Sequence, residues 1–116
     1  MTDLPTYDET VTASDLLENT HPGQMLRGDY LEPLGITPYK LAKGTGLSQT
    51  HVSEIMRGQR SITPMTSLLL GKFLGMSARF WLNLQNHHDL IEAQRANPER
   101  LERVIPYADL PPRPGV

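Results

Sequence analysis

The sequence predicts an all-α fold in which five short helices pack together, and three observations lead to this prediction. Thr37 and Thr63 each precede a proline, and threonine caps helix N-termini while proline suits the first helical position. Gly46, Gly58 and Gly75 stand where segments with apolar residues at helical spacing should end. No stretch of six residues alternates between apolar and polar side chains as a strand would. Helices joined by about three to six residues favour a compact bundle.

Each helix is expected where a start signal is followed by apolar residues at helical spacing. The first spans residues 22–31 and opens on a proline. The second (38–44) and fourth (64–74) follow a threonine and open on proline, whereas the third (49–57) and fifth (78–96) follow a serine that can cap them. The inward-facing residues are, in chain order, Met25, Leu26, Tyr30, Leu41, Ala42, Val52, Ile55, Met56, Leu70, Leu74, Phe80, Trp81 and Leu84.

Charge and proline content divide the chain into three parts. Residues 1–20 hold five acidic residues and no lysine or arginine, and this net charge of −5 defines an acidic N-terminal extension. Residues 21–95 hold the expected helices and form the predicted folded domain. Residues 96–116 form a Pro-rich tail, and we expect both extensions to be flexible. The average net charge of −2 hides a basic stretch, residues 37–81, where six basic residues face a single acidic one.

The second and third helices are joined by the tight segment Gly44–Thr45–Gly46–Leu47. Two short helices on a glycine-containing turn are typical of a helix-turn-helix. Ser48 can cap the third helix, and the outward face of that helix carries polar side chains that can bond base edges or phosphates. Such a surface is typical of proteins that read the DNA major groove. The outward residues are Gln49, Thr50, Ser53, Glu54 and Arg57, with His51 beside them.

Motifs on both sides of the turn carry a more specific resemblance. They are HPG (21–23), LEPLG (31–35), Leu41-Ala42, SEI (53–55) with Gly58, Ile62-Thr63 and FWLNLQ (80–85). The sequence resembles the Cro/C1-type helix-turn-helix family, and within it the HigA/VapI branch of antitoxins. The resemblance implies a five-helix Cro/C1 repressor-like fold and a transcriptional autorepressor that dimerises on a palindromic double-stranded DNA operator. It also implies neutralisation of a HigB-like toxin, a small mRNA-cleaving protein of the RelE/ParE-like fold.

The resemblance places the DNA-binding residues by position. Base contacts are predicted for Gln49, Thr50, Ser53 and Glu54. Backbone contacts are predicted for Lys40, Lys43, Ser48, His51, Arg57 and Arg60. Two alternatives stay open: Glu54 accepts a bond from a cytosine amino group, or it orients Arg57. One departure concerns Gly44 and Thr45, where the family usually has a helix former and an apolar residue, so we expect a loose end to the second helix.

Two further surfaces are expected to bind proteins. The fifth helix has apolar residues to spare, and two recognition helices must lie roughly 34 Å apart on DNA, so we expect a homodimer interface there. Its residues are Leu84, His88, Leu90 and Ile91. The acidic extension either solubilises the chain or lies on a basic toxin through charge complementarity. The toxin-contacting residues are then Leu4, Tyr7, Asp8, Glu9, Leu16 and Leu17.

Several function classes are excluded or disfavoured. The absence of cysteine removes disulfides, Cys-ligated zinc and cysteine nucleophiles. His87 and His88 are adjacent on a helix and point about 100° apart, so they cannot share one metal ion. We therefore expect no enzyme activity, metal, cofactor or small-molecule substrate. The N-terminus has no targeting pattern and no apolar run could span a membrane, so a cytoplasmic protein is expected. A stand-alone repressor without a toxin partner is the alternative function.

Overall fold

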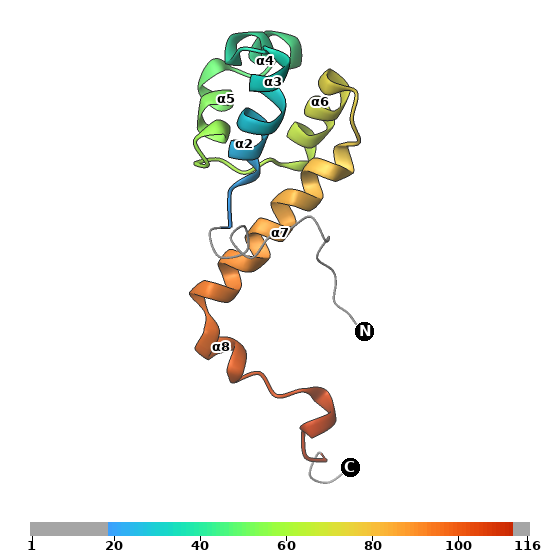
Figure 1. Cartoon of the computed structure of the whole chain (residues 1–116). Coiled ribbons are helices and arrows are strands. Elements are labelled where there is room, and N and C mark those ends of the chain that lie inside the picture. The colour runs from blue at the N-terminus through green and yellow to red at the C-terminus, as the bar shows by residue number, and fades with distance from the viewer. Residues whose placement is uncertain (1–18, 113–116) are drawn as a thin grey trace.

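The computed structural model of the chain describes residues 19–112, and every regular element in that range is a helix (Figure 1). The elements are α2 (Pro22–Met25), the π-helix η1 (Leu26–Leu31), α3 (Glu32–Leu34), α4 (Pro38–Thr45), α5 (Gln49–Met56), α6 (Pro64–Leu74), α7 (Ala78–Ala96), α8 (Pro98–Glu102) and the 3₁₀-helix η2 (Tyr107–Asp109). The predicted all-α fold is confirmed. α2, η1 and α3 follow one another without a break, so the first expected helix continues past residue 31 to Leu34.

The hydrophobic core lies where these N-terminal helices, α4, α5 and α6 meet the first part of α7. Trp81 of α7 is completely buried at its centre. The rings of Tyr30 and Phe80 stand edge-on to it, each with its centroid 5.1 Å from that of Trp81. Edge-to-face packing of aromatic rings adds to the large apolar area that these side chains bury. The remaining buried apolar residues of this core cluster are Leu26, Leu31, Leu41, Ala42, Val52, Ile55, Met56, Ile62 and Leu70.

The end of α4 is firmly held, contrary to the loose end expected from Gly44 and Thr45. The Thr45 hydroxyl donates to the Leu41 carbonyl at 2.7 Å and accepts from the Leu47 amide at 3.3 Å. Gly44 lies against the ring of Phe73 in α6, and a Cβ at this position would stand 2.1 Å from that ring. The expectation was wrong because the two residues use a side-chain hydrogen bond and a close contact in place of apolar burial.

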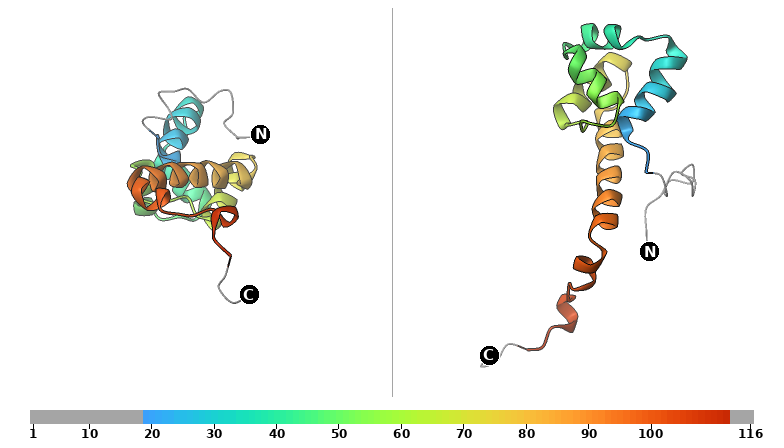
Figure 2. Two further views of the ribbon diagram at one scale, coloured as in Figure 1. Left: turned by 90° about the horizontal axis from the view of Figure 1, so that it is seen from below. Right: turned by 90° about the vertical axis from the view of Figure 1, so that its left-hand side faces the viewer.

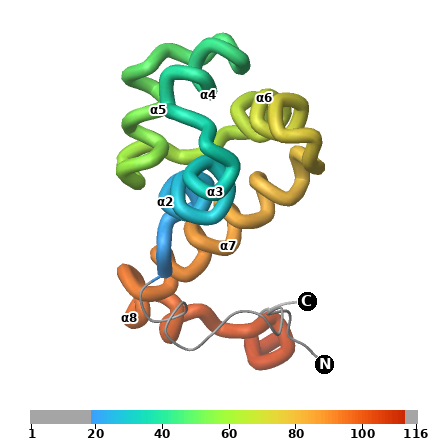
Figure 3. The backbone as a smooth tube through the Cα atoms, turned by 45° about the horizontal axis from the view of Figure 1, so that its top comes forward, coloured from blue at the N-terminus to red at the C-terminus, as the bar shows by residue number. Residues whose placement is uncertain are grey.

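α7 continues well beyond the domain. Its first part packs along α6, whereas its last turns and α8 extend away from the other helices (Figures 1 and 2). Every described residue after Ile91 is exposed, so residues 92–112 form a C-terminal arm. Figure 3 shows α4 and α5 at the end of the domain opposite to this arm.

The arm contains helical segments where the sequence predicted only a flexible tail. α8 begins at Pro98, whose fixed φ suits the first helical position, and η2 follows directly on Pro106 as its N-cap. The toxin-contacting residues predicted in the acidic extension, Leu4 to Leu17, lie outside the described residues. Across residues 19–112, none of the helices combines the length and the apolar character that crossing a membrane demands.

Candidate nucleic-acid interface

Side-chain caps fix where the two helices of the helix-turn-helix begin. The Thr37 hydroxyl accepts from the Lys40 amide at 3.1 Å, and the Ser48 hydroxyl accepts from the His51 amide at 3.0 Å. Each cap satisfies one amide that the first turn leaves without a partner. Gly46 takes the left-handed conformation between the helices, with φ at 83°. The turn therefore holds α5 at a defined angle to α4, and both caps lie at the residues that the sequence predicted.

α5 presents two different faces. Val52, Ile55 and Met56 are buried in the core and anchor the helix from below. Gln49 and Thr50, in the first turn, are exposed. The other two predicted base-contacting residues, Ser53 and Glu54, are half-buried, and so is His51. The predicted backbone-contacting residues Lys40, Lys43, Ser48, Arg57 and Arg60 are all exposed.

Both arginines of this surface are hydrogen-bonded to polar side chains beside them. Arg57 donates through Nη1 to the Ser53 hydroxyl and through Nε and Nη2 to Oε1 of Gln59, at 3.3 and 3.2 Å. Arg60 donates through Nε to Oε1 of Glu54 at 2.8 Å, and its Nη2 lies 2.8 Å from the same oxygen in an ion pair. Glu54 therefore pairs with Arg60 and not with Arg57, because the chain after α5 turns back and brings Arg60 over the outer face of the helix.

His51 differs from the other members of the surface. Its Nε2 is buried, and among the described residues no hydrogen-bond partner for this atom is found. Burial lowers the pKa of His51, the neighbouring Arg60 guanidinium lowers it further, and the Glu54 carboxylate opposes both effects. The imidazole is therefore neutral at neutral pH and adds no positive charge to the surface.

The HPG motif holds the N-terminal helix against α5. His21 Nδ1 accepts from the Gly23 amide at 2.9 Å and caps α2, and Pro22 takes the first helical position. Because this bond needs an unprotonated Nδ1, it agrees with the lowered pKa of His21, which has burial as its main cause and the nearby His88 as a second, with Asp89 opposing. Gly23 lies directly on the backbone carbonyl of Ile55 at the end of α5.

Gln85 is a structural residue that the sequence reasoning missed. Its buried side chain accepts from the Ile62 amide at 2.8 Å and donates to the Asp89 carboxylate at 2.9 Å. Ile62 belongs to the loop 57–63 that follows α5 and carries both arginines. A signal was present, since Gln85 closes the FWLNLQ motif, but nothing in the sequence tells which amide it meets.

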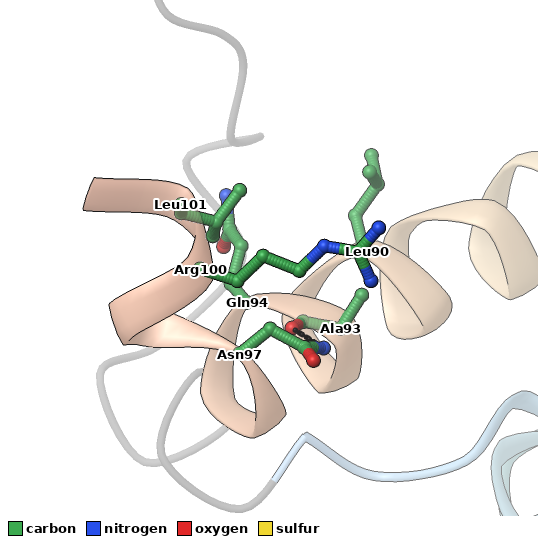
Figure 4. A pocket seen from close by; sticks show the side chains of 6 residues that line it. All are labelled: Leu90, Ala93, Gln94, Asn97, Arg100 and Leu101. Atoms are coloured by element: carbon green, nitrogen blue, oxygen red, sulfur yellow. Dashed lines mark hydrogen bonds between the residues drawn. The ribbon is translucent and has the colours of Figure 1, made fainter. Parts of the chain in front are cut away.

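The predicted dimer residues separate onto two sides of α7. Leu84 packs against the core, the His88 ring lies 5.0 Å from that of His21, and Ile91 is only 8% exposed. Spacings of four and three residues bring these three onto one helix face, which the domain itself occupies. Leu90, in contrast, is 63% exposed. It lies at a shallow depression where α7 meets α8, lined by Leu90, Ala93, Gln94, Asn97, Arg100 and Leu101 (Figure 4).

Comparisons with known proteins agree with this geometry. A helix-turn-helix family model matches residues 29–81. The chain is 40% identical to "Virulence-associated protein I" of Dichelobacter nodosus over 76% of this chain and 81% of that protein. It is 34% identical to "Antitoxin HigA-1" of Vibrio cholerae over 72% and 79% of the two chains. The solved structure of "Pseudomonas aeruginosa antitoxin HigA with higBA promoter" superposes with a TM-score of 0.73 at 34% identity, covering 77% of this chain and 98% of that one. The chain belongs to the HigA/VapI branch of the Cro/C1-type helix-turn-helix family.

Proposed function

We propose that this chain is a cytoplasmic HigA-type antitoxin. In this role it binds a palindromic operator as a homodimer, represses its own operon and neutralises a HigB-like toxin. The observation that carries the DNA part is the outer surface of α5, where exposed Gln49 and Thr50 begin a helix that ends beside two arginines. The relative from Pseudomonas aeruginosa, whose structure includes promoter DNA, has the same fold.

The groups on this surface suit the two kinds of DNA contact. Gln49 can bond a base edge in the major groove, and a good bidentate contact of this kind discriminates by about 1–3 kcal/mol. Lys40, Lys43 and Arg57 surround it with positive charge that can neutralise phosphates, and Arg60 lies beside them in its ion pair with Glu54. Phosphate contacts place the protein on the duplex, and base contacts give the sequence preference.

The DNA part is tested by fluorescence anisotropy with the duplex directly upstream of the chain's own reading frame and a scrambled duplex of equal length. Arg57→Ala should weaken binding to both duplexes and lower the slope of log K against log salt by about 1. Gln49→Ala should cost about 1–3 kcal/mol on the upstream duplex and little on the scrambled one. Equal losses on the two duplexes would show that Gln49 reads no base.

The proposed homodimer follows from the two-fold symmetry of the proposed palindromic operator. A palindromic site needs two recognition helices about 34 Å apart, and one copy of the chain supplies one. The surface we propose for the second copy is Leu90 together with the arm, because the arm lacks a core of its own and leaves its apolar side chains uncovered. The exposed residues concerned are Leu90, Leu101, Val104, Ile105, Tyr107 and Leu110.

The toxin part rests on the family and on charge. Two relatives, from Vibrio cholerae and Pseudomonas aeruginosa, carry the name antitoxin HigA. The acidic extension, with a net charge of −5, suits a basic partner. The alternative is a stand-alone repressor whose extensions bind nothing. Wild-type chain that co-purifies with the product of an adjacent reading frame supports the antitoxin, and a locus without such a frame supports the repressor.

A deletion locates the toxin-binding segment. Removal of residues 1–18 leaves Asn19 and its bonds to the His88 carbonyl and the Glu92 carboxylate, both at 2.9 Å, so the domain keeps its N-terminal anchor. We expect this variant to bind the upstream duplex as the full chain does and to lose its ability to bind and neutralise the toxin. Retained neutralisation would rule out the acidic extension as the toxin contact.

A further inference from the structure

The two arginines at the end of α5 have partners of different charge. Arg57 is bonded to Ser53 and Gln59, which are neutral, so its positive charge is uncompensated by these contacts. Arg60 is bonded to a carboxylate, with the Glu54 side chain 31% exposed and that of Arg60 48% exposed. The first arginine presents a net positive charge on this surface, whereas the second forms a neutral pair.

The position of Glu54 makes this difference important. It lies on the outward side of α5, one turn from Thr50, on the face that approaches DNA in the proposed function. A bare carboxylate there repels phosphates, and like charges placed against each other at an interface are unfavourable. Arg60 covers that charge with one hydrogen bond and an ion-pair contact to the same carboxylate oxygen.

We propose that Glu54 is a positioning residue and not a base-reading one: it holds Arg60 over α5, and Arg60 in turn masks its carboxylate from the DNA. Base reading then falls to Gln49 and Thr50, which are exposed in the first turn, and to Ser53, whose hydroxyl accepts from Arg57. This inference rests on the proposed DNA binding and narrows the set of residues that determine the sequence preference from four to three.

The pair also ties two segments together. Arg60 belongs to the loop after α5 and reaches back six residues to Glu54, so the ion pair connects the loop to the outer face of the helix. On the inner side of the same loop, the buried amide of Ile62 donates a hydrogen bond to the Gln85 side chain. With the loop held from inside and outside, the Arg60 guanidinium keeps one place relative to α5, and fewer side-chain conformations are lost when it meets a phosphate.

A double-mutant cycle tests the proposal with the full chain and the two duplexes described above. Arg60→Ala uncovers the Glu54 carboxylate, so it should weaken binding more than its matched control Arg57→Ala, which uncovers only neutral groups. Adding Glu54→Ala to Arg60→Ala should then recover affinity about two- to five-fold, the size expected for an exposed charge pair. Glu54→Ala alone should leave the ratio of affinities for the two duplexes unchanged.

Other outcomes of the same measurements would contradict the positioning role of Glu54. If Glu54 accepts a bond from a base, the double variant binds the upstream duplex more weakly than Arg60→Ala, and Glu54→Ala lowers the affinity ratio as Gln49→Ala does. Equal affinity of the double variant and Arg60→Ala would also overturn the masking role. Wild-type chain that binds both duplexes alike would overturn the proposed function itself, and this inference with it. Thermal unfolding midpoints close to wild type should accompany all variants, since the replaced side chains lie at the surface.

Discussion

Gly23 shows how a single residue decides whether two helices can meet. A Cβ at this position would stand 1.8 Å from the carbonyl oxygen of Ile55, far inside van der Waals contact. The obstacle is backbone at the end of α5, which cannot rotate away as a flexible side chain can. The HPG motif therefore combines a capping histidine, a proline at the first helical position and a glycine that allows close packing.

Replacement of Gly23 by alanine should destabilise the chain, and Gly28, in the adjoining helix η1, gives the matched control. Gly23→Ala should cost at least about 1–3 kcal/mol, because it forces α2 away from α5. Gly28→Ala meets nothing within 4 Å and should stabilise the chain by up to about 1 kcal/mol through helix propensity. Chemical denaturation measures both. A Gly23→Ala variant as stable as wild type would contradict the close contact.

At the scale of the elements, α7 supports the DNA-binding surface from a distance. Gln85 accepts from the Ile62 amide inside the protein, and this bond holds the loop that carries Arg57 and Arg60. A buried backbone amide without a partner is costly, so the loop has one favourable path across α7, at Gln85. α7, which carries none of the predicted DNA contacts, thus determines where Arg57 and Arg60 lie.

Gln85→Met should cost about 1–3 kcal/mol, because methionine fills much of the space but leaves the Ile62 amide unpaired. Amide hydrogen exchange should show lower protection at Ile62 than in wild type. Asp89→Asn is the control, since it keeps an oxygen that can accept from Gln85 Nε2, and it should change stability little. Unchanged exchange at Ile62 in the Gln85 variant would show that another contact holds the loop.

At the scale of the whole molecule, the chain has a packed domain at one end and an uncovered arm at the other (Figures 1 and 2). Helices as short as α8 are marginal in water without packing partners. The exposed apolar side chains of the arm therefore favour coverage by another surface. The second copy in the proposed homodimer would satisfy this need and would also supply the second recognition helix.

Charged residues on this surface should separate the two copies. Leu90→Asp combined with Leu101→Asp should shift the chain to monomer in sedimentation velocity and weaken binding to the upstream duplex, because each buried leucine contributes about 1.5–3 kcal/mol. Leu68→Asp on α6 is the control, since Leu68 is similarly exposed but lies on the domain. Dimers that persist in the double variant would place the interface elsewhere.

The elements could be predicted closely from the sequence. Helices α6 and α7 begin and end at the predicted residues, because Thr63, Ser77 and Gly75 act through hydrogen bonds and dihedral angles within one turn. The family assignment confirms the predicted fold and the prediction that the chain is not an enzyme. The DNA contacts of Gln49 and its neighbours, the dimer and the toxin contacts stay predictions.

What the sequence by itself determined is the set of helices, the helix-turn-helix and the family, since these follow from local caps, turns and motifs. Only the tertiary structure decided the partners of particular side chains. Gln85 meets an amide 23 residues away, Glu54 meets Arg60 and not Arg57, and α7 turns His88 and Ile91 toward the domain while Leu90 faces solvent. The physical reason is that helical spacing shows which residues share a face, but the packing of the other helices selects which face is buried.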